Sequence, residues 1–157
     1  MHYAYHPCDD AVLSLHELAG RSWQLQPGRR QLAAEDIDGG MDELGVLLMG
    51  HERGAYWYGS RLTNDQAVAL APHNNATSLQ TVAGVLSGVV WAMNHRDSGI
   101  VDPEEMDFTE VMEVALPYLG EMAGVYSNWT PLRDRNTLFP ERTDTEDPWQ
   151  FLNVLAF

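Results

Sequence analysis

The stretch Asp42–Leu62, which reads DELGVLLMGHERGAYWYGSRL, decides the fold of this chain. Its first half, Glu43–Met49, is a short apolar run, and its second half, Ala55–Leu62, is rich in aromatic residues. The connection Gly50–Gly54 begins and ends with glycine. Two such runs around a glycine-bounded connection predict a β-hairpin with a long turn. Because the first strand is apolar almost throughout, we expect it to be buried on both faces.

Downstream of the hairpin the sequence predicts a long helix over Ala76–His95, with Asn74 or Asn75 as its N-cap. An apolar stripe at helical spacing is expected to face the core; it comprises Leu79, Val82, Ala83, Leu86, Val89, Val90 and Met93. A second stripe has small residues alone, namely Thr77, Thr81, Gly84 and Gly88. Small side chains let another backbone come close, and we interpret this second stripe as a place of tight packing.

Shorter elements are expected on both sides of these two. The first is a helix over Asp9–Leu18, capped by Asp9 or Asp10 and ended by Gly20. The others are a strand over Trp23–Gln26, one or two helical turns over Asp65–Leu70, a helix from Asp102-Pro103 to Leu116, a strand over Ala123–Trp129, and an irregular tail that ends in an apolar anchor, Phe151–Phe157. The predicted class is α+β, or α/β within a larger fold.

The charge of the chain restricts its partners. Acidic residues outnumber basic ones by 23 to 9, which gives a net charge of −14. A nucleic acid is therefore not expected as a partner, whereas a cationic ligand would be attracted, although many proteins are acidic for solubility alone. The single cysteine, Cys8, excludes an internal disulfide, and the sequence has no run of about 18 apolar residues to cross a membrane. A cytoplasmic location is the expectation.

Several chemistries are excluded by residues that the sequence lacks. All nine basic residues are arginine, so the chain supplies no lysine for a Schiff base or a phosphate-binding loop. It also lacks Gly-x-Gly-x-x-Gly, the turn that binds a dinucleotide pyrophosphate. His16–Gly20 (HELAG) is similar to the start of a zinc-protease helix, but Gly20 stands where the second histidine is required. We expect no metal site.

The most suggestive polar stretch is His73–Ser78 (HNNATS), at the expected start of the long helix. Its amides and hydroxyls, together with free backbone N–H groups and the helix dipole, suit a phosphate or another polar ligand. Ordinary N-capping explains the same residues equally well.

Two weaker groups suit an amine. Carboxylates at the first helix can hold an ammonium group, and aromatic rings on the second strand offer it a cation–π face. Helix capping and core packing, respectively, are the interpretations that we favour for these groups. The residues concerned are His6, Cys8, Asp9 and Asp10 in the first group, and Tyr56, Trp57 and Tyr58 in the second.

Longer strings resemble the C-terminal part of the bacterial homospermidine synthase family, which belongs to the saccharopine dehydrogenase-like superfamily. They follow one another in order along nearly the whole chain: YHPCDDAVLSLHELAG (5–20), DELGVLLMGHERGAYWYGSRL (42–62), APHNNATSLQTVAGVLSGVVWA (71–92), PEEMDF (103–108), PYLGEMAGVYSNWTPL (117–132) and DPWQF (147–151).

The resemblance implies a two-domain enzyme, with an N-terminal Rossmann domain and a mixed α/β substrate domain, that works as a homodimer. Bound NAD takes a hydride from putrescine, a second putrescine displaces ammonia from the resulting imine, and the hydride returns to give homospermidine. Spermidine can also act as the donor. Such dicationic substrates suit an acidic chain.

The resemblance also implies that the front of the enzyme, with its Rossmann domain, is absent from this chain. Residues 1–70 would be the end of the substrate and dimerisation domain, and residues 71–157 a helical segment that packs back on the cofactor domain. We predict that Asn75, Thr77 and Ser78 lie near NAD, whereas catalytic residues stay unassigned. His6, Asp9, Asp10 and Trp57 are candidates for the amine side.

The chain alone is expected to be inactive. Two alternatives remain open. The chain can be a non-catalytic dimerisation or binding module, or a fragment of a related polyamine reductase that makes carboxylated products. The reductase needs a cationic side chain that binds the substrate carboxylate, and no arginine among the candidate positions supplies it.

Overall fold

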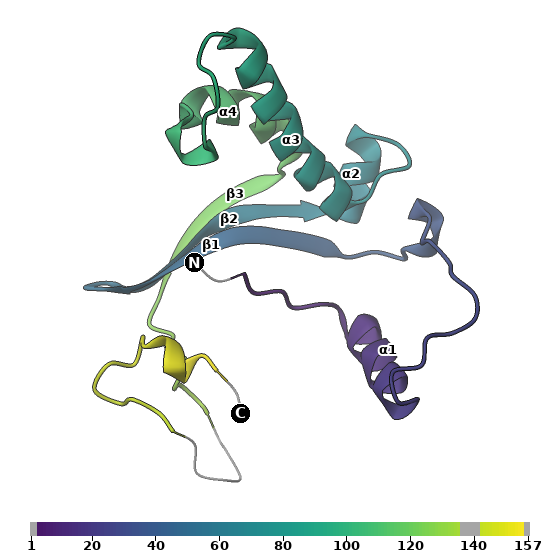
Figure 1. Ribbon diagram of the computed structural model, residues 1–157, viewed down its shortest axis with the longest axis vertical. Coiled ribbons are helices and arrows are strands. Elements are labelled where there is room, and N and C mark those ends of the chain that lie inside the picture. The colour runs from purple at the N-terminus through teal and green to yellow at the C-terminus, as the bar shows by residue number, and fades with distance from the viewer. Residues whose placement is uncertain (1–2, 136–141, 156–157) are drawn as a thin grey trace. The chain divides into compact units, whose positions relative to one another are not determined.

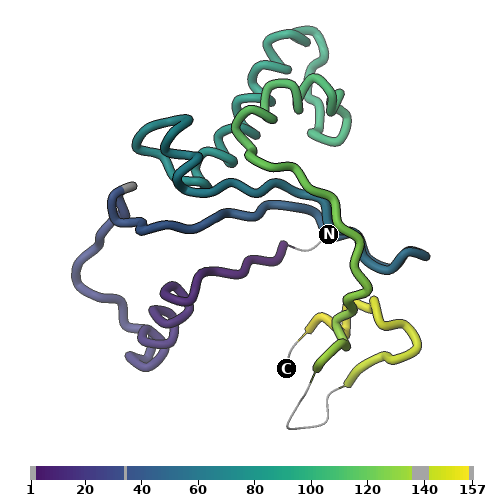
Figure 2. Tube along the Cα trace, turned by 180° about the vertical axis from the view of Figure 1, so that it is seen from behind, coloured from purple at the N-terminus to yellow at the C-terminus, as the bar shows by residue number. Residues whose placement is uncertain are grey.

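The computed structural model describes residues 3–135 and 142–155, which are drawn in colour in Figures 1 and 2. The chain divides into two compact units, Met1–Leu32 and Ala33–Phe157. Residue 70 itself lies within the second unit, where β3 (Glu121–Ser127) pairs with β2 (Gly54–Thr63). The assignment of residues 1–70 and 71–157 to different domains of a longer enzyme stays a prediction.

The described part of the first unit contains one helix, α1 (Asp9–Gly20). Its N-cap is Cys8, so the predicted cap at Asp9 or Asp10 is wrong, and both acids lie in the first turn, where the helix dipole favours them. The strand predicted over Trp23–Gln26 is also wrong. Instead, the backbone N–H of Trp23 donates to the carbonyl of Leu18 at 3.0 Å. Trp23 has a positive φ of 62°, which turns the chain back toward the end of α1.

The second unit is built on a sheet of three antiparallel strands in the order β1-β2-β3 (Figure 1). The predicted hairpin is confirmed as β1 (Met41–His51) and β2 (Gly54–Thr63), and β3 (Glu121–Ser127) is the strand expected near Ala123. The turn is shorter than predicted, because both strands run to its edge. A bulge at Gly50, with a φ of +80°, and a φ of +86° at Gly54 let the chain reverse there.

The prediction that β1 is buried on both faces is wrong for this chain. β1 is an edge strand, and none of its residues is buried. Val46 and Leu48 on one face are 60% and 54% exposed, and Leu47 on the other is 42% exposed. The sequence pattern indicates that this strand is apolar, but the described residues do not form the layers that would cover β1.

Two helices cover part of one face of the sheet. The predicted helical turns form α2 (Asn64–Leu70), which begins with a capping box between Thr63 and Gln66. The long helix is confirmed as α3 (Ala76–Asn94), capped by Asn75. The core of the unit forms where these helices meet the end of β2 and comprises Leu62, Ala67, Ala76 and Leu79, with Ala71 and Tyr118 packed against it.

The side of α3 that faces the core differs from the predicted stripe. The buried residues are Ala76, Leu79, Gln80, Ala83, Ser87 and Trp91. Gln80 is buried because its Nε2 donates to Ser60 Oγ at 3.0 Å and to the carbonyl of Leu119 at 3.3 Å. Two members of the predicted stripe, Leu79 and Ala83, are buried as predicted, whereas the prediction is wrong for Val82, Leu86, Val89 and Met93, which are exposed.

The second predicted stripe also differs, because the tight packing expected there is absent from the described part of the chain. None of the described residues comes within 4 Å of a Cβ placed on Gly84 or Gly88. α3 is, moreover, long and apolar enough to cross a membrane by length and composition, which corrects the expectation that no segment is. A core helix of a soluble protein passes the same test, and this one is partly buried against the sheet.

The helix predicted from Asp102 to Leu116 is interrupted. It consists of a 3₁₀ turn, Pro103–Glu105, then α4 (Phe108–Ala115), and a second 3₁₀ turn, Leu116–Tyr118. The break lies at Met106 and Asp107, because the Asp107 carboxylate accepts hydrogen bonds from the backbone N–H groups of Thr109 and Glu110 and so starts a new helix.

The tail is irregular, as predicted, apart from a 3₁₀ turn over Phe151–Asn153. Its anchor is polar rather than apolar. Asn153 is fully buried; its Nδ2 donates to the carbonyls of Asp144 and Asp147, and its Oδ1 accepts from the backbone N–H of Asp144. Phe151 and Val154 are partly exposed, while Ala156 and Phe157 lie outside the described residues.

Replacing Gly59 by alanine should destabilise the chain. The added Cβ would collide with the carbonyl oxygen of Leu44 and would lie 2.6 Å from the Cα of Gly45. Both are backbone atoms, so the strands must move apart, at a cost of about 1–3 kcal/mol. Thermal unfolding followed by circular dichroism measures the loss.

The matched control is Gly84→Ala, which adds the same methyl group to an open position of α3. Alanine is preferred to glycine within a helix by about 1 kcal/mol, so this variant should melt at a higher temperature. A Gly59→Ala variant as stable as the unaltered chain would contradict the close approach of β1 and β2.

Candidate functional site

The predicted cofactor residues Asn75, Thr77 and Ser78 do lie together at the start of α3. Asn75 Oδ1 accepts a hydrogen bond from the backbone N–H of Ser78 at 2.8 Å, and the N–H of Ala76 donates to Asn64 Oδ1 at 3.3 Å. Two of the backbone N–H groups that could bind a phosphate therefore already donate hydrogen bonds within the chain. Capping accounts for Asn75, while the side chains of Thr77 and Ser78 are exposed and available.

Trp57, predicted for the amine side, lies in the sheet with its ring against glycine. A Cβ on Gly45 would meet the indole at 2.6 Å, which explains why no larger residue fits there. The guanidinium of Arg61 stands 5.5 Å from the ring centroid, and Arg61 Nε lies 2.7 Å from Glu43 Oε1. An arginine of the chain itself thus occupies the cation–π position, which supports the packing interpretation.

The other predicted amine-side residues, His6, Asp9 and Asp10, lie in the first unit, at and before the start of α1. All three are exposed. Within that unit, no hydrogen bond from a described residue orients these side chains, so their role on the amine side stays a prediction.

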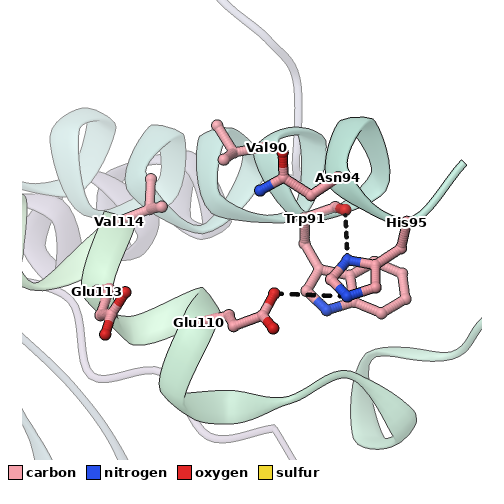
Figure 3. A pocket seen from close by; sticks show the side chains of 7 residues that line it. All are labelled: Val90, Trp91, Asn94, His95, Glu110, Glu113 and Val114. Atoms are coloured by element: carbon pink, nitrogen blue, oxygen red, sulfur yellow. Dashed lines mark hydrogen bonds and ion pairs between the residues drawn. The ribbon is translucent and has the colours of Figure 1, made fainter.

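A pocket of about 420 Å³ lies between α3 and α4 (Figure 3), and the sequence analysis did not predict it. Its lining is Val90, Trp91, Asn94, His95, Glu110, Glu113 and Val114. The His95 ring stacks on Trp91, with centroids 4.2 Å apart and planes 13° from parallel. The spacing of Trp91 and His95 by four residues puts both on one helix face, and this spacing is the signal that could have found the pair.

The surroundings of His95 determine which of its nitrogens carries hydrogen. Nδ1 lies 2.9 Å from the carbonyl oxygen of Trp91, which can only accept, so Nδ1 must be the donor. Nε2 then faces Glu110 Oε2 at 3.6 Å, and a proton there completes an ion pair between α3 and α4. The residues of the pocket therefore join the two helices, and its carboxylates favour cations.

Asp107 beside this pocket is the one group of the described residues whose pKa clearly departs from its ordinary value. The backbone N–H of Thr109 lowers the pKa of Asp107 most, followed by the Thr109 hydroxyl and the backbone N–H of Glu110, with a smaller contribution from the charge of His95. These donors stabilise the charged carboxylate. Among residues 3–135 and 142–155, no cluster of three or more histidine, cysteine or acidic side chains is suited to a metal.

Comparison with known proteins identifies the class of this fold. Residues 1–126 match the model of the saccharopine dehydrogenase C-terminal domain, and the chain belongs to that family. It is 54% identical to the homospermidine synthase of Blastochloris viridis and 51% identical to that of Mesorhizobium japonicum, each over 155 residues, or 99% of the chain. It spans 32% of the length of these relatives, as their C-terminal part.

A solved structure agrees with these matches. The homospermidine synthase of Legionella pneumophila, determined in complex with NAD, superposes on 97% of this chain with a TM-score of 0.87 and 54% identity. The match covers 33% of that enzyme. The predicted fold class, the C-terminal portion of a saccharopine dehydrogenase-like enzyme, is therefore confirmed.

The Asp107 cap should make stability depend on pH in the acid range. Because the pKa of Asp107 is lower in the folded chain than its ordinary 3.8, the cap stabilises the fold fully above that value and loses its effect as the pH falls through the folded pKa. The melting temperature of Asp107→Ala should lie below that of the unaltered chain at neutral pH, and the gap should close in acid.

Glu104→Ala is the control, because it removes a carboxylate from the same loop without touching the α4 cap. It should show no such closing gap. A difference between Asp107→Ala and the unaltered chain that stays constant down to the most acidic pH would contradict the role of the charged cap.

Proposed function

We propose that this chain is the C-terminal third of a homospermidine synthase, which joins the aminobutyl group of one putrescine, or of spermidine, to a second putrescine. NAD takes up the hydride and returns it, and ammonia is released. The observation that carries this proposal is an identity of 51–54% with two homospermidine synthases, spread over 99% of the chain. A C-terminal domain shared through fold alone would not require such identity along its whole length.

Charge supports the polyamine substrate. A net charge of −14 attracts dications at long range. The substrate amine itself forms the imine, so the absence of lysine is compatible with the chemistry. A cytoplasmic homodimer is the form that we propose for the whole enzyme.

The chain alone should bind NAD weakly or not at all. It lacks the glycine-rich turn for a pyrophosphate, and the start of α3 satisfies two of its own N–H groups. NAD in the Legionella pneumophila enzyme supports the cofactor for the family. We infer that most of its site belongs to the part of the enzyme that precedes the matched region.

A binding or dimerisation module without catalysis is the second candidate function. The exposed apolar residues of β1 and α3 favour it, because monomeric proteins seldom expose large contiguous apolar surfaces. Under this alternative the chain would associate with a partner, but would contribute no group that affects turnover.

Thermal shift distinguishes an incomplete piece from a complete site. The chain purified alone should unfold cooperatively, and neither NAD nor putrescine, added singly or together, should raise its melting temperature. A ligand that binds the folded state alone would raise it by mass action. A clear rise with NAD would contradict the proposal that the main cofactor site lies elsewhere.

A chimera tests the activity. The first two thirds of the Blastochloris viridis enzyme joined to this chain should form homospermidine from putrescine and NAD, and the first two thirds without this chain should not. A soluble, folded chimera that releases no homospermidine would overturn the proposed function.

The predicted cofactor role of Asn75 can be tested in the chimera by Asn75→Ser. Serine is as good an N-cap as asparagine, so α3 and the melting temperature should be preserved. If the Asn75 amide contacts NAD, the KM for NAD should rise several-fold. An unchanged KM, with Thr77→Ala and Ser78→Ala equally silent, would leave this segment as a helix cap alone.

A further inference from the structure

α3 has three faces, and one of them contacts the rest of the described chain. Its 19 residues include no acidic or basic side chain and no histidine, which is unusual for a helix at a protein surface. The face that packs on the sheet is held by Gln80 through its hydrogen bonds to Ser60 and Leu119. The other two faces point away from the core.

The second face is apolar. Its residues, spaced by four, three and four positions, are Val82, Leu86, Val89 and Met93, and they are between 41% and 61% exposed. Val85, which is 63% exposed, extends this face. Leaving so many aliphatic side chains in water is unfavourable, at about 25 cal/mol for each Å² of apolar surface.

The third face, the small-residue face, has the same spacing and comprises Thr77, Thr81, Gly84 and Gly88. At Gly84 and Gly88 none of the described residues lies within 4 Å of an added Cβ. Glycines within a helix cost stability unless something approaches their backbone closely. The two outer faces together form a surface suited to a partner that packs around α3, with a helix or strand close to the glycines.

Two occupants fit this surface poorly. A second copy of this chain would bring an equal net charge of −14, which disfavours the pairing of two isolated chains through α3, and the homodimer proposed for the whole enzyme would use another surface. An anionic membrane surface would repel the chain for the same reason. A helix that spanned the bilayer would, in addition, have to give up the buried hydrogen bonds of Gln80.

The relatives indicate a third occupant. The chain matches the last third of each homospermidine synthase, so about two thirds of those polypeptides precede the matched region. Such a length is enough to supply several covering elements, and it is the part of these enzymes that has no counterpart in the chain.

We propose that the two outer faces of α3 form a docking surface for the polypeptide that precedes the matched region in homospermidine synthases. α3 is then the central helix of the complete enzyme, enclosed on all sides. The proposal rests on the proposed function insofar as the partner is the front of that enzyme, but it concerns packing and not chemistry.

Cysteine accessibility tests the docking surface. Cys8→Ser removes the one natural cysteine of this chain, and Val89→Cys then places a single thiol on the apolar face. Maleimide labelling of that peptide, followed by mass spectrometry, should be rapid in the chain alone. In the chimera with the first two thirds of the Blastochloris viridis enzyme, labelling should be at least about tenfold slower, because the docked partner excludes the reagent.

Two matched positions serve as controls. Ala83→Cys lies on the buried face of α3, 1% exposed, and should be protected in both proteins, which also reports that the variant chain is folded. Asp97→Cys follows the helix in an exposed turn and should react rapidly in both. Gly84→Leu adds a second measurement, since it should leave the isolated chain stable but lower the melting temperature of the chimera.

Each outcome decides the proposal. Equal labelling of Val89→Cys in the chain and the chimera would overturn it, as would protection in the chain alone at high concentration, which would identify a second copy as the occupant. Protection that appears solely with anionic vesicles would identify a membrane. A chimera that makes homospermidine while Val89→Cys stays reactive would support the proposed function but overturn the docking surface. An inactive chimera with a protected thiol would support the docking surface but overturn the proposed function.

Discussion

The side-chain amide of Gln80 joins α3 to β2 and to the segment before β3 in the larger unit of this chain. From the middle of α3 it donates one hydrogen bond to Ser60 on β2 and another to the carbonyl of Leu119, just before β3. Helix, central strand and returning strand are thus joined at one buried point. Since a buried amide N–H without a partner is costly, this contact fixes the rotation of α3 together with the buried side chains of Leu79 and Ala83.

The strands of the sheet also pack closely, around the indole of Trp57. Gly45 and Gly59 leave room for the indole of Trp57, and the guanidinium of Arg61 lies over the ring. Trp57 thus packs within the sheet, and its role on the amine side stays a prediction. Meanwhile β1 stays at the edge with both faces exposed, so the sheet has room for further strands and layers.

Exposure of β1 and α3 is consistent with the comparisons. A chain that corresponds to one third of a larger enzyme should carry surfaces that the rest of the enzyme covers, and the apolar residues that disagreed with prediction lie on those surfaces. The Trp91–His95–Glu110 cluster differs in kind, because it is assembled within the chain and joins α3 to α4. Its residues come from two successive helices, so no single sequence motif contains all three of them.

The sequence by itself determined the local elements and the family. Glycines around 50–54 specified the hairpin, Asn75 the start of α3, and the strings along the chain the resemblance to homospermidine synthases. These features depend on neighbouring residues, whose propensities act over a few positions. Tertiary structure alone decided which face of α3 is buried, that Asn153 anchors the tail, and that His95 meets Glu110. These outcomes depend on contacts between separate segments, which hydrophobic periodicity does not encode, whereas the break at Asp107 follows from a local cap by its own side chain.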